Sequence, residues 1–371
     1  MSQAALVLED GKVFLGAAFG ATGATLGEVV FCTGMTGYQE TLTDPSYHRQ
    51  IVVATAPQIG NTGWNDEDDE SRRIWVAGYV VRDPARTPSN WRSRRTLDDA
   101  LVEQDVVGIA GVDTRTLTRH IRERGAMRGG VFSGDALGTT DEMVEQVLAS
   151  PQMVGADLAG EVTATEAYVV PAAGETRFRV VALDVGIKTN TPRMMAERGI
   201  ETHVLPATAT IDDVLAVEPD GFFLANGPGD PATTDGPMAL TRSVLEQQIP
   251  TFGICFGHQI LGRALGLSTY KLRYGHRGIN IPVIDVATGR VAITAQNHGF
   301  ALEGEPGQRF DTPYGGAVIS HYCPNDGCVE GVRALDVPAF SVQYHPEAAA
   351  GPHDAAGLFD EFAGLMEEKR A

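Results

Sequence analysis

Residues 251–259 read Thr251-Phe252-Gly253-Ile254-Cys255-Phe256-Gly257-His258-Gln259, and they carry the strongest structural signal in the chain. A short apolar run leads into a cysteine that has a glycine two residues away on each side. This spacing is the thiol counterpart of the nucleophile elbow Gly-x-Ser-x-Gly, in which the glycines let a strand and the next helix approach around a strained turn. We expect Cys255 at a helix N-terminus, where the helix dipole favours a thiolate, with Gln259 one turn along on the same face. A buried structural cysteine is the alternative.

Around this segment, short apolar runs alternate with helical patterns of about ten residues. The predicted strands are 178–185, 202–205, 221–225 and 251–254, and the predicted helices are 191–198, 211–217, 237–248 and 257–265. This alternation predicts an α/β fold with a doubly wound, mainly parallel sheet. Residues 280–345 differ, because Val-rich runs and the turn Asn325-Asp326-Gly327 predict added antiparallel strands.

A second motif follows another apolar run, in Ser341-Val342-Gln343-Tyr344-His345-Pro346-Glu347. In an extended chain His345 and Glu347 point to the same side, and Pro346 biases His345 toward that conformation. The carboxylate can then hold one imidazole nitrogen while the other accepts a proton from a thiol, as in a catalytic triad. The alternative is a solvated histidine with an unrelated glutamate.

A third motif, the turn Leu224-Ala225-Asn226-Gly227-Pro228-Gly229-Asp230-Pro231, also follows a predicted strand. It could offer a backbone N–H that forms an oxyanion hole with the N–H of Phe256, although many strand-to-helix turns look alike. The carboxyl ends of parallel strands lie at one edge of a sheet, so we expect the three motifs to meet there.

The composition is that of a globular protein, with 371 residues of which 43% are hydrophobic and 21% charged. This length suggests two or three domains. The 29 basic and 48 acidic residues give a net charge of −19, which argues against binding nucleic acid or anionic membranes through bulk charge. The N-terminal residues lack the basic start and long apolar run of a signal peptide, no apolar run is long enough to span a bilayer, and the four cysteines are scattered. We therefore expect a soluble, cytoplasmic protein with reduced thiols.

The first half of the chain has a less regular pattern. Strands are predicted at 28–33 and 50–55 and a helix at 114–124, with dense Gly and Pro turns between them. We expect a separate mixed α/β domain over residues 1–162. Residues 163–177 are predicted to be a linker that includes a short extended piece, and residues 178–371 form the second domain.

Taken together, the three motifs resemble the class I (triad) glutamine amidotransferases over residues 178–371. Other segments resemble the small subunit of carbamoyl-phosphate synthases, so the resemblance spans nearly the whole chain. These segments are Met35-Thr36-Gly37-Tyr38-Gln39-Glu40, Thr43-Asp44-Pro45-Ser46-Tyr47, Ile59-Gly60-Asn61, Asp113-Thr114-Arg115, Gln296-Asn297-His298-Gly299-Phe300 and Gly351-Pro352-His353-Asp354-Ala355-Ala356.

The resemblance implies that Cys255 attacks the side-chain amide of glutamine and forms a γ-glutamyl thioester. His345 would act as the base and then as the acid for the departing ammonia, with Glu347 orienting it. The residues that would hold glutamine are Ser46, Gly227, Gly229, Phe256, Gln259, Asn297, Gly299 and Phe300. The family more often has leucine where this chain has Phe256, which could alter the rim of the pocket.

The resemblance also implies a large synthetase subunit as partner, in a heterodimer or a higher oligomer of heterodimers. Ammonia would pass to it through an internal channel, and bicarbonate and two ATP would give carbamoyl phosphate for arginine and pyrimidine synthesis. This chain lacks a Gly-x-x-x-x-Gly-Lys-[Ser/Thr] loop. We therefore expect no cofactor and no metal on it, and ATP and Mg²⁺ on the large subunit. The alternatives are an amidotransferase for another synthase, a non-catalytic scaffold of the large subunit and a stand-alone cysteine hydrolase.

Two further features stay open at this point. Cys323 and Cys328 flank the predicted turn, where we favour ordinary strand cysteines over a zinc site or a redox pair. His298 lies between two of the predicted glutamine-binding residues, and it either assists the site or has a local structural role.

Overall fold

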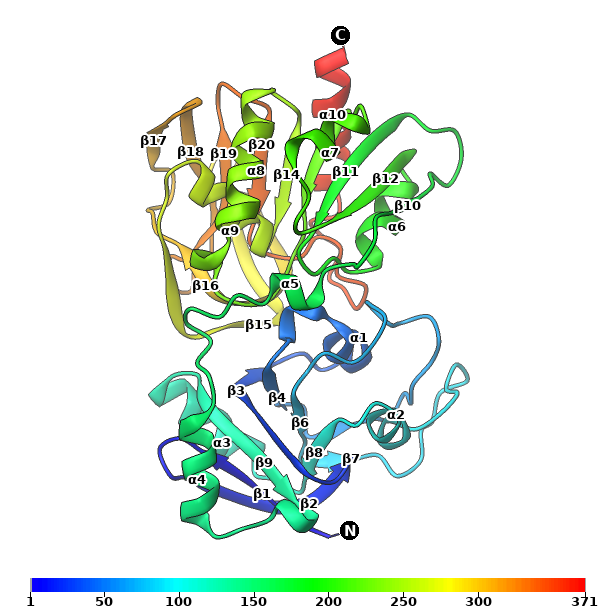
Figure 1. The fold of residues 1–371 in the computed structure, drawn as a ribbon, viewed down its shortest axis with the longest axis vertical. Helices are drawn as coiled ribbons and strands as arrows, with labels where there is room; N and C mark the ends of the chain where they lie inside the picture. Colours follow the sequence, from blue (N-terminus) through cyan, green and yellow to red (C-terminus); the bar gives the residue numbers. More distant parts are fainter. Residues whose placement is uncertain (1, 371) are drawn as a thin grey trace. The chain divides into compact units, whose positions relative to one another are not determined.

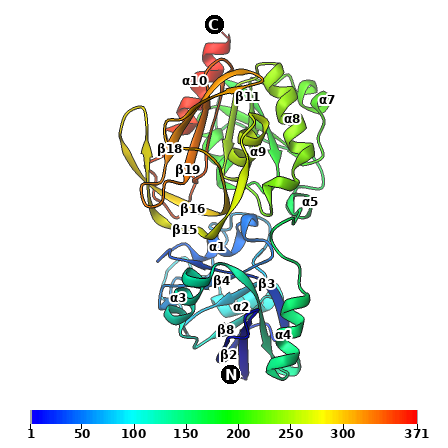
Figure 2. The ribbon, with the colours of Figure 1, turned by 90° about the vertical axis from the view of Figure 1, so that its left-hand side faces the viewer.

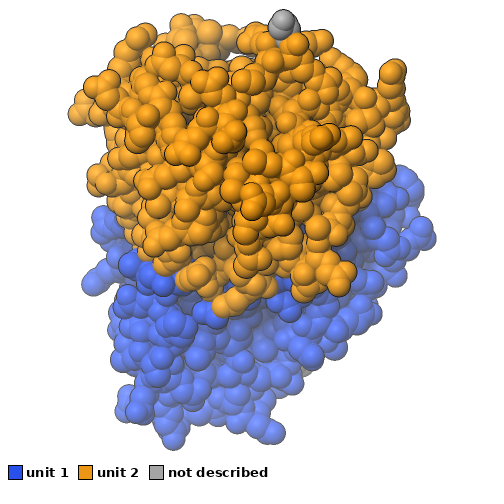
Figure 3. All heavy atoms as spheres, turned by 45° about the horizontal axis from the view of Figure 1, so that its top comes forward, with its two compact units in different colours: residues 1–156, 273–278 blue, residues 157–272, 279–371 orange. Residues whose placement is uncertain are grey.

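The computed structural model describes residues 2–370 and divides the chain into two compact units, which are coloured separately in Figure 3. The first consists of Met1–Ala156 with Arg273–Gly278, and the second of Asp157–Leu272 with Ile279–Ala371. Each unit has hydrophobic core clusters of its own. Among residues 2–370, no helix has the length and apolar character that a membrane span requires.

The first unit is built on a closed β-barrel in the order β1-β2-β8-β6-β4-β3-β9 (Figure 1). The strands are β1 (Gln3–Leu8), β2 (Val13–Gly20), β3 (Ala24–Cys32), β4 (Gln50–Ala54), β6 (Gly78–Val80), β8 (Val107–Ala110) and β9 (Met127–Ser133). Strands β3, β4, β6 and β8 pair in parallel, with Val30 opposite Val52, and the other pairs are antiparallel. A short separate pair joins β5 (Gln58–Ile59) to β7 (Asp83–Pro84).

Helices pack against the barrel and fill the connections. They are α1 (Tyr38–Thr43), α2 (Leu97–Glu103), α3 (Thr114–Arg124) and α4 (Thr140–Ala149), with the 3₁₀ turns η1 (Pro45–Tyr47) and η2 (Gly134–Ala136). The helix predicted at 114–124 and the strands predicted at 28–33 and 50–55 are confirmed. Closure into a barrel was not predicted. Strand β4 is buried on both faces, with Val52 in one core cluster and Ile51 in another, so its sequence lacks the alternation that marks a barrel wall.

The second unit is built on one large sheet in the order β10-β12-β11-β13-β14-β20-β19-β18-β15-β16, with β17 beside β18. Strands β12, β11, β13, β14 and β20 run parallel, as predicted, and the strands beyond β20 are antiparallel additions. The strands are β10 (Tyr168–Val170), β11 (Phe178–Asp184), β12 (Ile200–Pro206), β13 (Gly221–Leu224), β14 (Thr251–Ile254), β15 (Thr269–Asp285), β16 (Val291–Leu302), β17 (Arg309–Thr312), β18 (Gly315–Tyr322), β19 (Val329–Ala334) and β20 (Ala339–Val342).

Helices cover both faces of this sheet (Figure 2). They are α5 (Ala159–Val162), α6 (Asn190–Ala196), α7 (Ile211–Ala216), α8 (Asp235–Glu246), α9 (Phe256–Ala264) and α10 (Leu358–Arg370), with the 3₁₀ turn η3 (Pro231–Thr233). Phe252 of β14 packs edge-on against Phe359 of α10, whereas its neighbour Gly253 faces the backbone of α9. Successive strand residues point to opposite faces, so α9 and α10 cover opposite sides. The doubly wound α/β fold predicted for this half is confirmed.

Two predicted local features are also found in the second unit. The turn Asn325-Asp326-Gly327 joins the antiparallel strands β18 and β19, and Gly327 has a φ of +78°, which a tight turn requires. Residues 163–177 include β10, the expected extended piece, which pairs antiparallel with the edge strand β12.

Candidate active site

Cys255 occupies a strained strand-to-helix turn at the end of β14. It caps the N-terminus of α9 with φ 54° and ψ −102°, a combination that costs a residue other than glycine about 1–3 kcal/mol. A side chain at Gly257 would place its Cβ 2.2 Å from the carbonyl oxygen of Leu224, and one at Gly253 would lie 2.7 Å from the carbonyl oxygen of Gly257. Neither glycine can carry a side chain, so the spacing is what the close approach of strand and helix demands.

The three motifs follow the carboxyl ends of three neighbouring parallel strands, as predicted. Strand β13 pairs with β14 and β14 pairs with β20, and the backbone N–H of Cys255 donates to Val342 over 2.9 Å. A Cβ on Gly227 would lie 3.3 Å from the ring of Phe256, so the turn after β13 lies against the start of α9. As the first residue of α9, Phe256 has an N–H with no acceptor inside the helix. The N–H of Phe256 is therefore available to an anion.

His345 and Glu347 form the predicted hydrogen-bonded pair, with Nδ1 of His345 2.6 Å from Oε1 of Glu347. A third member was not predicted from the sequence. The Lys188 Nζ atom lies 2.6 Å from the same carboxylate oxygen. All three side chains are buried, and the exposed fraction of Glu347 is 0%. The side-chain amide of Asn190, two residues after Lys188, donates to the backbone carbonyl of Glu347 over 2.5 Å.

Charge controls the protonation of this pair more strongly than burial. Burial raises the pKa of Glu347, but Lys188 and His345 outweigh it and lower that pKa to about 2. Burial and Lys188 lower the pKa of His345, but the Glu347 carboxylate and the Cys255 sulfur outweigh them and raise it to about 10. Among residues 2–370, Nε2 of His345 makes no hydrogen bond of ordinary geometry. The Cys255 sulfur lies close enough to His345 to help raise the pKa of that histidine.

The predicted glutamine-binding residues of the second unit lie around Cys255 in part. The Sγ atom of Cys255 donates to the carbonyl of Asn297 over 3.5 Å. The side-chain nitrogen of Gln259 donates to the carbonyl of Phe300 over 2.7 Å and to Oε1 of Gln343 over 2.9 Å. Gln259 therefore braces the segment that contains Asn297 and Phe300, and its contact with glutamine stays a prediction.

The remaining predicted residues are placed as follows. Gly229 is half-buried with a φ of +97°, which suits a turn where only glycine fits easily, and Gly299 is half-buried in β16. Ser46 belongs to the first unit, where it lies in η1 and its backbone N–H donates to Asp44. Its role at Cys255 therefore stays a prediction.

Lys188 had one available signal in the sequence. It follows the predicted strand 178–185, and the carboxyl ends of parallel strands share one edge of the sheet. A lone lysine in a loop reads as a solvated side chain, and no motif spacing connects it to Glu347.

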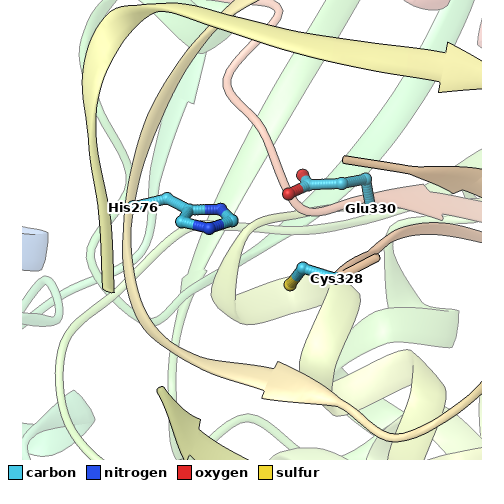
Figure 4. Close-up of side chains that lie close together, drawn as sticks. All are labelled: His276, Cys328 and Glu330. Carbon is cyan, nitrogen blue, oxygen red and sulfur yellow. The ribbon is translucent and has the colours of Figure 1, made fainter. Parts of the chain in front are cut away.

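Three further side chains of the second unit, those of His258, Cys323 and Cys328, have pKa values that burial shifts strongly. His258 is buried, its Nδ1 lies 2.9 Å from Oγ of Ser341, and burial lowers its pKa to about 3, so it stays neutral. Burial raises the pKa of Cys323 to about 12 and that of Cys328 further. Figure 4 shows Cys328 and Glu330 on the same side of the chain at the start of β19, and the third labelled residue, His276, belongs to the first unit.

Comparison with known proteins agrees with this fold. Residues 181–365 match the family "Glutamine amidotransferase class-I", so the second unit is a domain of this class. Residues 6–131 match the family "Carbamoyl-phosphate synthase small chain, CPSase domain". The chain belongs to the family of carbamoyl-phosphate synthase small chains.

Close relatives support the assignment along the full length of the chain. Carbamoyl phosphate synthase small chains from Streptomyces coelicolor and Mycolicibacterium paratuberculosis are each 68% identical to it, over 368 and 370 residues. The first match covers 99% of this chain and 97% of the relative, and the second covers 99% of both. The small chain from Mycobacterium leprae is 67% identical over 375 residues, with 100% of both chains covered.

Proposed function

We propose that this chain is the glutaminase subunit of a carbamoyl-phosphate synthase. The observation that carries the proposal is the geometry at the sheet edge, where Cys255 on a strained turn faces His345, which is held in turn by Glu347. Nucleophile, base and orienting carboxylate in this order are what acyl transfer through a thioester requires.

The chemistry proceeds in two halves. The thiol proton moves from Sγ of Cys255 to Nε2 of His345, and the sulfur attacks the side-chain amide carbon of glutamine. The N–H of Phe256 and the turn at Gly227 stabilise the negative charge that develops on the amide oxygen. His345 then returns its proton to the leaving nitrogen, so the C–N bond breaks, ammonia departs and a γ-glutamyl thioester remains.

In the second half, His345 takes a proton from water, and the resulting hydroxide attacks the thioester carbon. The C–S bond breaks, the sulfur regains the proton and glutamate leaves. His345 holds a proton readily because its pKa is raised, which suits the step in which ammonia departs. Throughout, Glu347 keeps Nδ1 protonated and leaves Nε2 to exchange protons with the substrate.

The partner in this proposal is a large synthetase subunit that binds ATP and Mg²⁺. In water at neutral pH, ammonia is mostly ammonium, which has no free electron pair for attack. Ammonia that passes directly to the large subunit is not protonated by bulk water on the way. There, bicarbonate and two ATP give carbamoyl phosphate. The product would supply arginine and pyrimidine synthesis.

The test is to reconstitute the full-length chain with the large subunit from the same organism. Carbamoyl phosphate is followed with either glutamine or ammonia as nitrogen donor, for the wild type, Cys255→Ser and Cys32→Ser. Cys255→Ser should lower the glutamine-driven rate about a thousandfold or more and leave the ammonia-driven rate unchanged. Cys32→Ser removes a buried thiol of the first unit and should retain both rates. A wild-type complex that cannot use glutamine would refute the proposal.

A further inference from the structure

A chain of hydrogen bonds fixes the orientation of the Gln296 side chain. The Thr294 hydroxyl lies 2.8 Å from the carbonyl of Ile281, which can only accept, so the hydroxyl donates its single proton there. The hydroxyl oxygen must then accept from Gln296, whose Nε2 lies 3.2 Å away. These contacts fix the orientation of the Gln296 side-chain amide: its nitrogen faces Thr294 and its oxygen Oε1 faces His298.

Both ring nitrogens of His298 consequently face acceptors. Nε2 lies 3.0 Å from Oε1 of Gln296, and Nδ1 lies 2.8 Å from the carbonyl of Phe300. A neutral imidazole has only one N–H and can donate to one of them, whereas an imidazolium donates to both. The side chain of His298 is buried, so an unmatched acceptor pair would be costly.

A counter-charge is in place for an imidazolium at this position. Oε1 of Glu330 lies 3.9 Å from Nε2 of His298, and the exposed fraction of the Glu330 side chain is 0%. A buried carboxylate at this distance favours the charged form of a histidine and is itself favoured by it.

The same segment connects this charge to the reaction site. The carbonyl of Phe300 accepts from His298 and also from Gln259, one turn after Cys255 on α9. The carbonyl of Asn297, the residue before His298, accepts from Sγ of Cys255. Holding residues 297–300 therefore holds one wall of the site around the nucleophile.

We propose that Glu330 is a positioning residue for glutamine binding, which keeps His298 as an imidazolium so that both of its N–H groups hold residues 297–300 in place. The proposal rests on the glutaminase function proposed above. Glu330 and His298 act through the segment and have no part in bond making or breaking.

Several other titratable or charged groups of the second unit also lie near Glu330 or the segment 297–300. Burial raises the pKa of the neighbouring hydroxyls and thiols, the Glu330 carboxylate raises each further, and burial lowers the pKa of His321. Lys271 lies over the ring of Phe300. These neighbours are Tyr270 and Lys271 on β15, His321 on β18, Cys323 and Cys328 beside the turn, and Tyr344 after β20.

The direct test observes the ring nitrogens of His298 in the full-length wild-type chain. Histidine is labelled with ¹⁵N, and the signals of His298 are assigned by their loss in His298→Gln. At about pH 7.5, above the ordinary histidine pKa of about 6.5, both nitrogens should have the shifts of protonated imidazolium. One unprotonated nitrogen would overturn the proposal, whatever the activity of the enzyme. This spectrum needs no variant to remain active.

The functional test compares Glu330→Gln with the wild type in the reconstituted complex. Without the carboxylate the imidazolium form of His298 is less favoured, so we expect one of its two hydrogen bonds to be lost as the pH rises. The KM for glutamine should increase about tenfold near pH 8 and recover toward the wild-type value near pH 6, with kcat little changed. The ammonia-driven rate should not change.

Two further variants separate positioning from general structural damage. Glu330→Asp keeps the charge and should restore most of the affinity for glutamine, and Glu305→Gln removes an exposed carboxylate of the same unit and should have no effect. An unchanged KM in Glu330→Gln, or an increase that does not depend on pH, would refute the role of Glu330. If the wild type fails to use glutamine, the proposed function fails, whereas the ¹⁵N spectrum still decides the charge of His298.

Discussion

At the scale of single residues, Glu347 couples the proposed reaction site to the stability of the fold. Its Oε1 atom lies 2.6 Å from both His345 and Lys188, and these contacts lower its pKa from 4.5 to about 2 although burial acts the other way. Between these pH values the unfolded chain binds a proton at this position and the folded protein does not. Glu347 therefore stabilises the fold above about pH 4.5, and this contribution is lost as the pH falls toward 2.

Glu347→Gln should remove this pH-dependent contribution, in addition to a constant loss from leaving Lys188 buried without its carboxylate. A fall in pKa from 4.5 to about 2 corresponds to roughly 3 kcal/mol at most. The difference in unfolding free energy between the wild type and the variant should shrink by up to this amount as the pH is lowered through this range. Urea unfolding at a series of pH values measures it. A difference that stays constant or grows on acidification would contradict the assignment.

At the scale of elements, the turn between β14 and α9 depends on the absence of a side chain. Gly257→Ala would bring Cβ to 2.2 Å from the backbone oxygen of Leu224, which cannot move without shifting β13. We expect a loss of about 3 kcal/mol or more in stability and a strong loss of glutamine-driven activity. Thermal unfolding and the two carbamoyl phosphate assays measure these effects.

Gly364→Ala is the matched control for this prediction. Gly364 lies in α10 of the same unit, and a Cβ there would meet nothing within 4 Å. Alanine favours a helix over glycine by about 1 kcal/mol, so this variant should be as stable as the wild type or more stable, with full activity. An equal loss of stability and activity in both variants would show that the close approach of strand and helix at Gly257 is not the cause.

The fold of the second unit was predicted well because its strands and helices are marked by patterns within short stretches of sequence. Each parallel strand is a short apolar run with a clear end, and the side chains that follow these ends gather at one edge. The barrel of the first unit was missed because strands such as β4 are buried on both faces, which hides the alternation of a barrel wall. Lys188 was missed because its pairing with Glu347 depends on the folded sheet and on no spacing in the sequence.

At the scale of the whole molecule, the four cysteines differ in their surroundings more than in their burial. All of them are buried and free. Burial, with added negative charge from Glu330 and Asp326, raises the pKa of Cys323 to about 12 and that of Cys328 further. Cys255 differs in that its sulfur acts on His345 and helps to raise the pKa of that histidine, whereas Cys323 and Cys328 lie next to the carboxylates of Glu330 and Asp326. A reagent that reacts with thiolates should therefore distinguish Cys255 from the other cysteines.

A chloroketone analogue of glutamine should add once per chain, at Cys255, and free glutamine should slow the reaction. Intact-mass measurement counts the adducts, and peptide mapping locates them. Cys255→Ser should remain unlabelled under the same conditions, and Cys323→Ser should be labelled as fast as the wild type. Labelling of Cys323 or Cys328 at a rate comparable to Cys255 would contradict the assignment of the nucleophile.

The membership of residues 273–278 in the first unit bears on how the gene can be divided. Within that unit, the carbonyl of Arg273 accepts from Ala126 and the carbonyl of Arg277 accepts from Thr33. A fragment that starts at Asp157 would carry this hexapeptide along without those donors, in the middle of the long strand β15. Neither unit is therefore encoded by one uninterrupted stretch of DNA. A shortened version of the amidotransferase half would need a redesigned six-residue segment, and the barrel half would need that segment supplied as a separate peptide or grafted onto its own end.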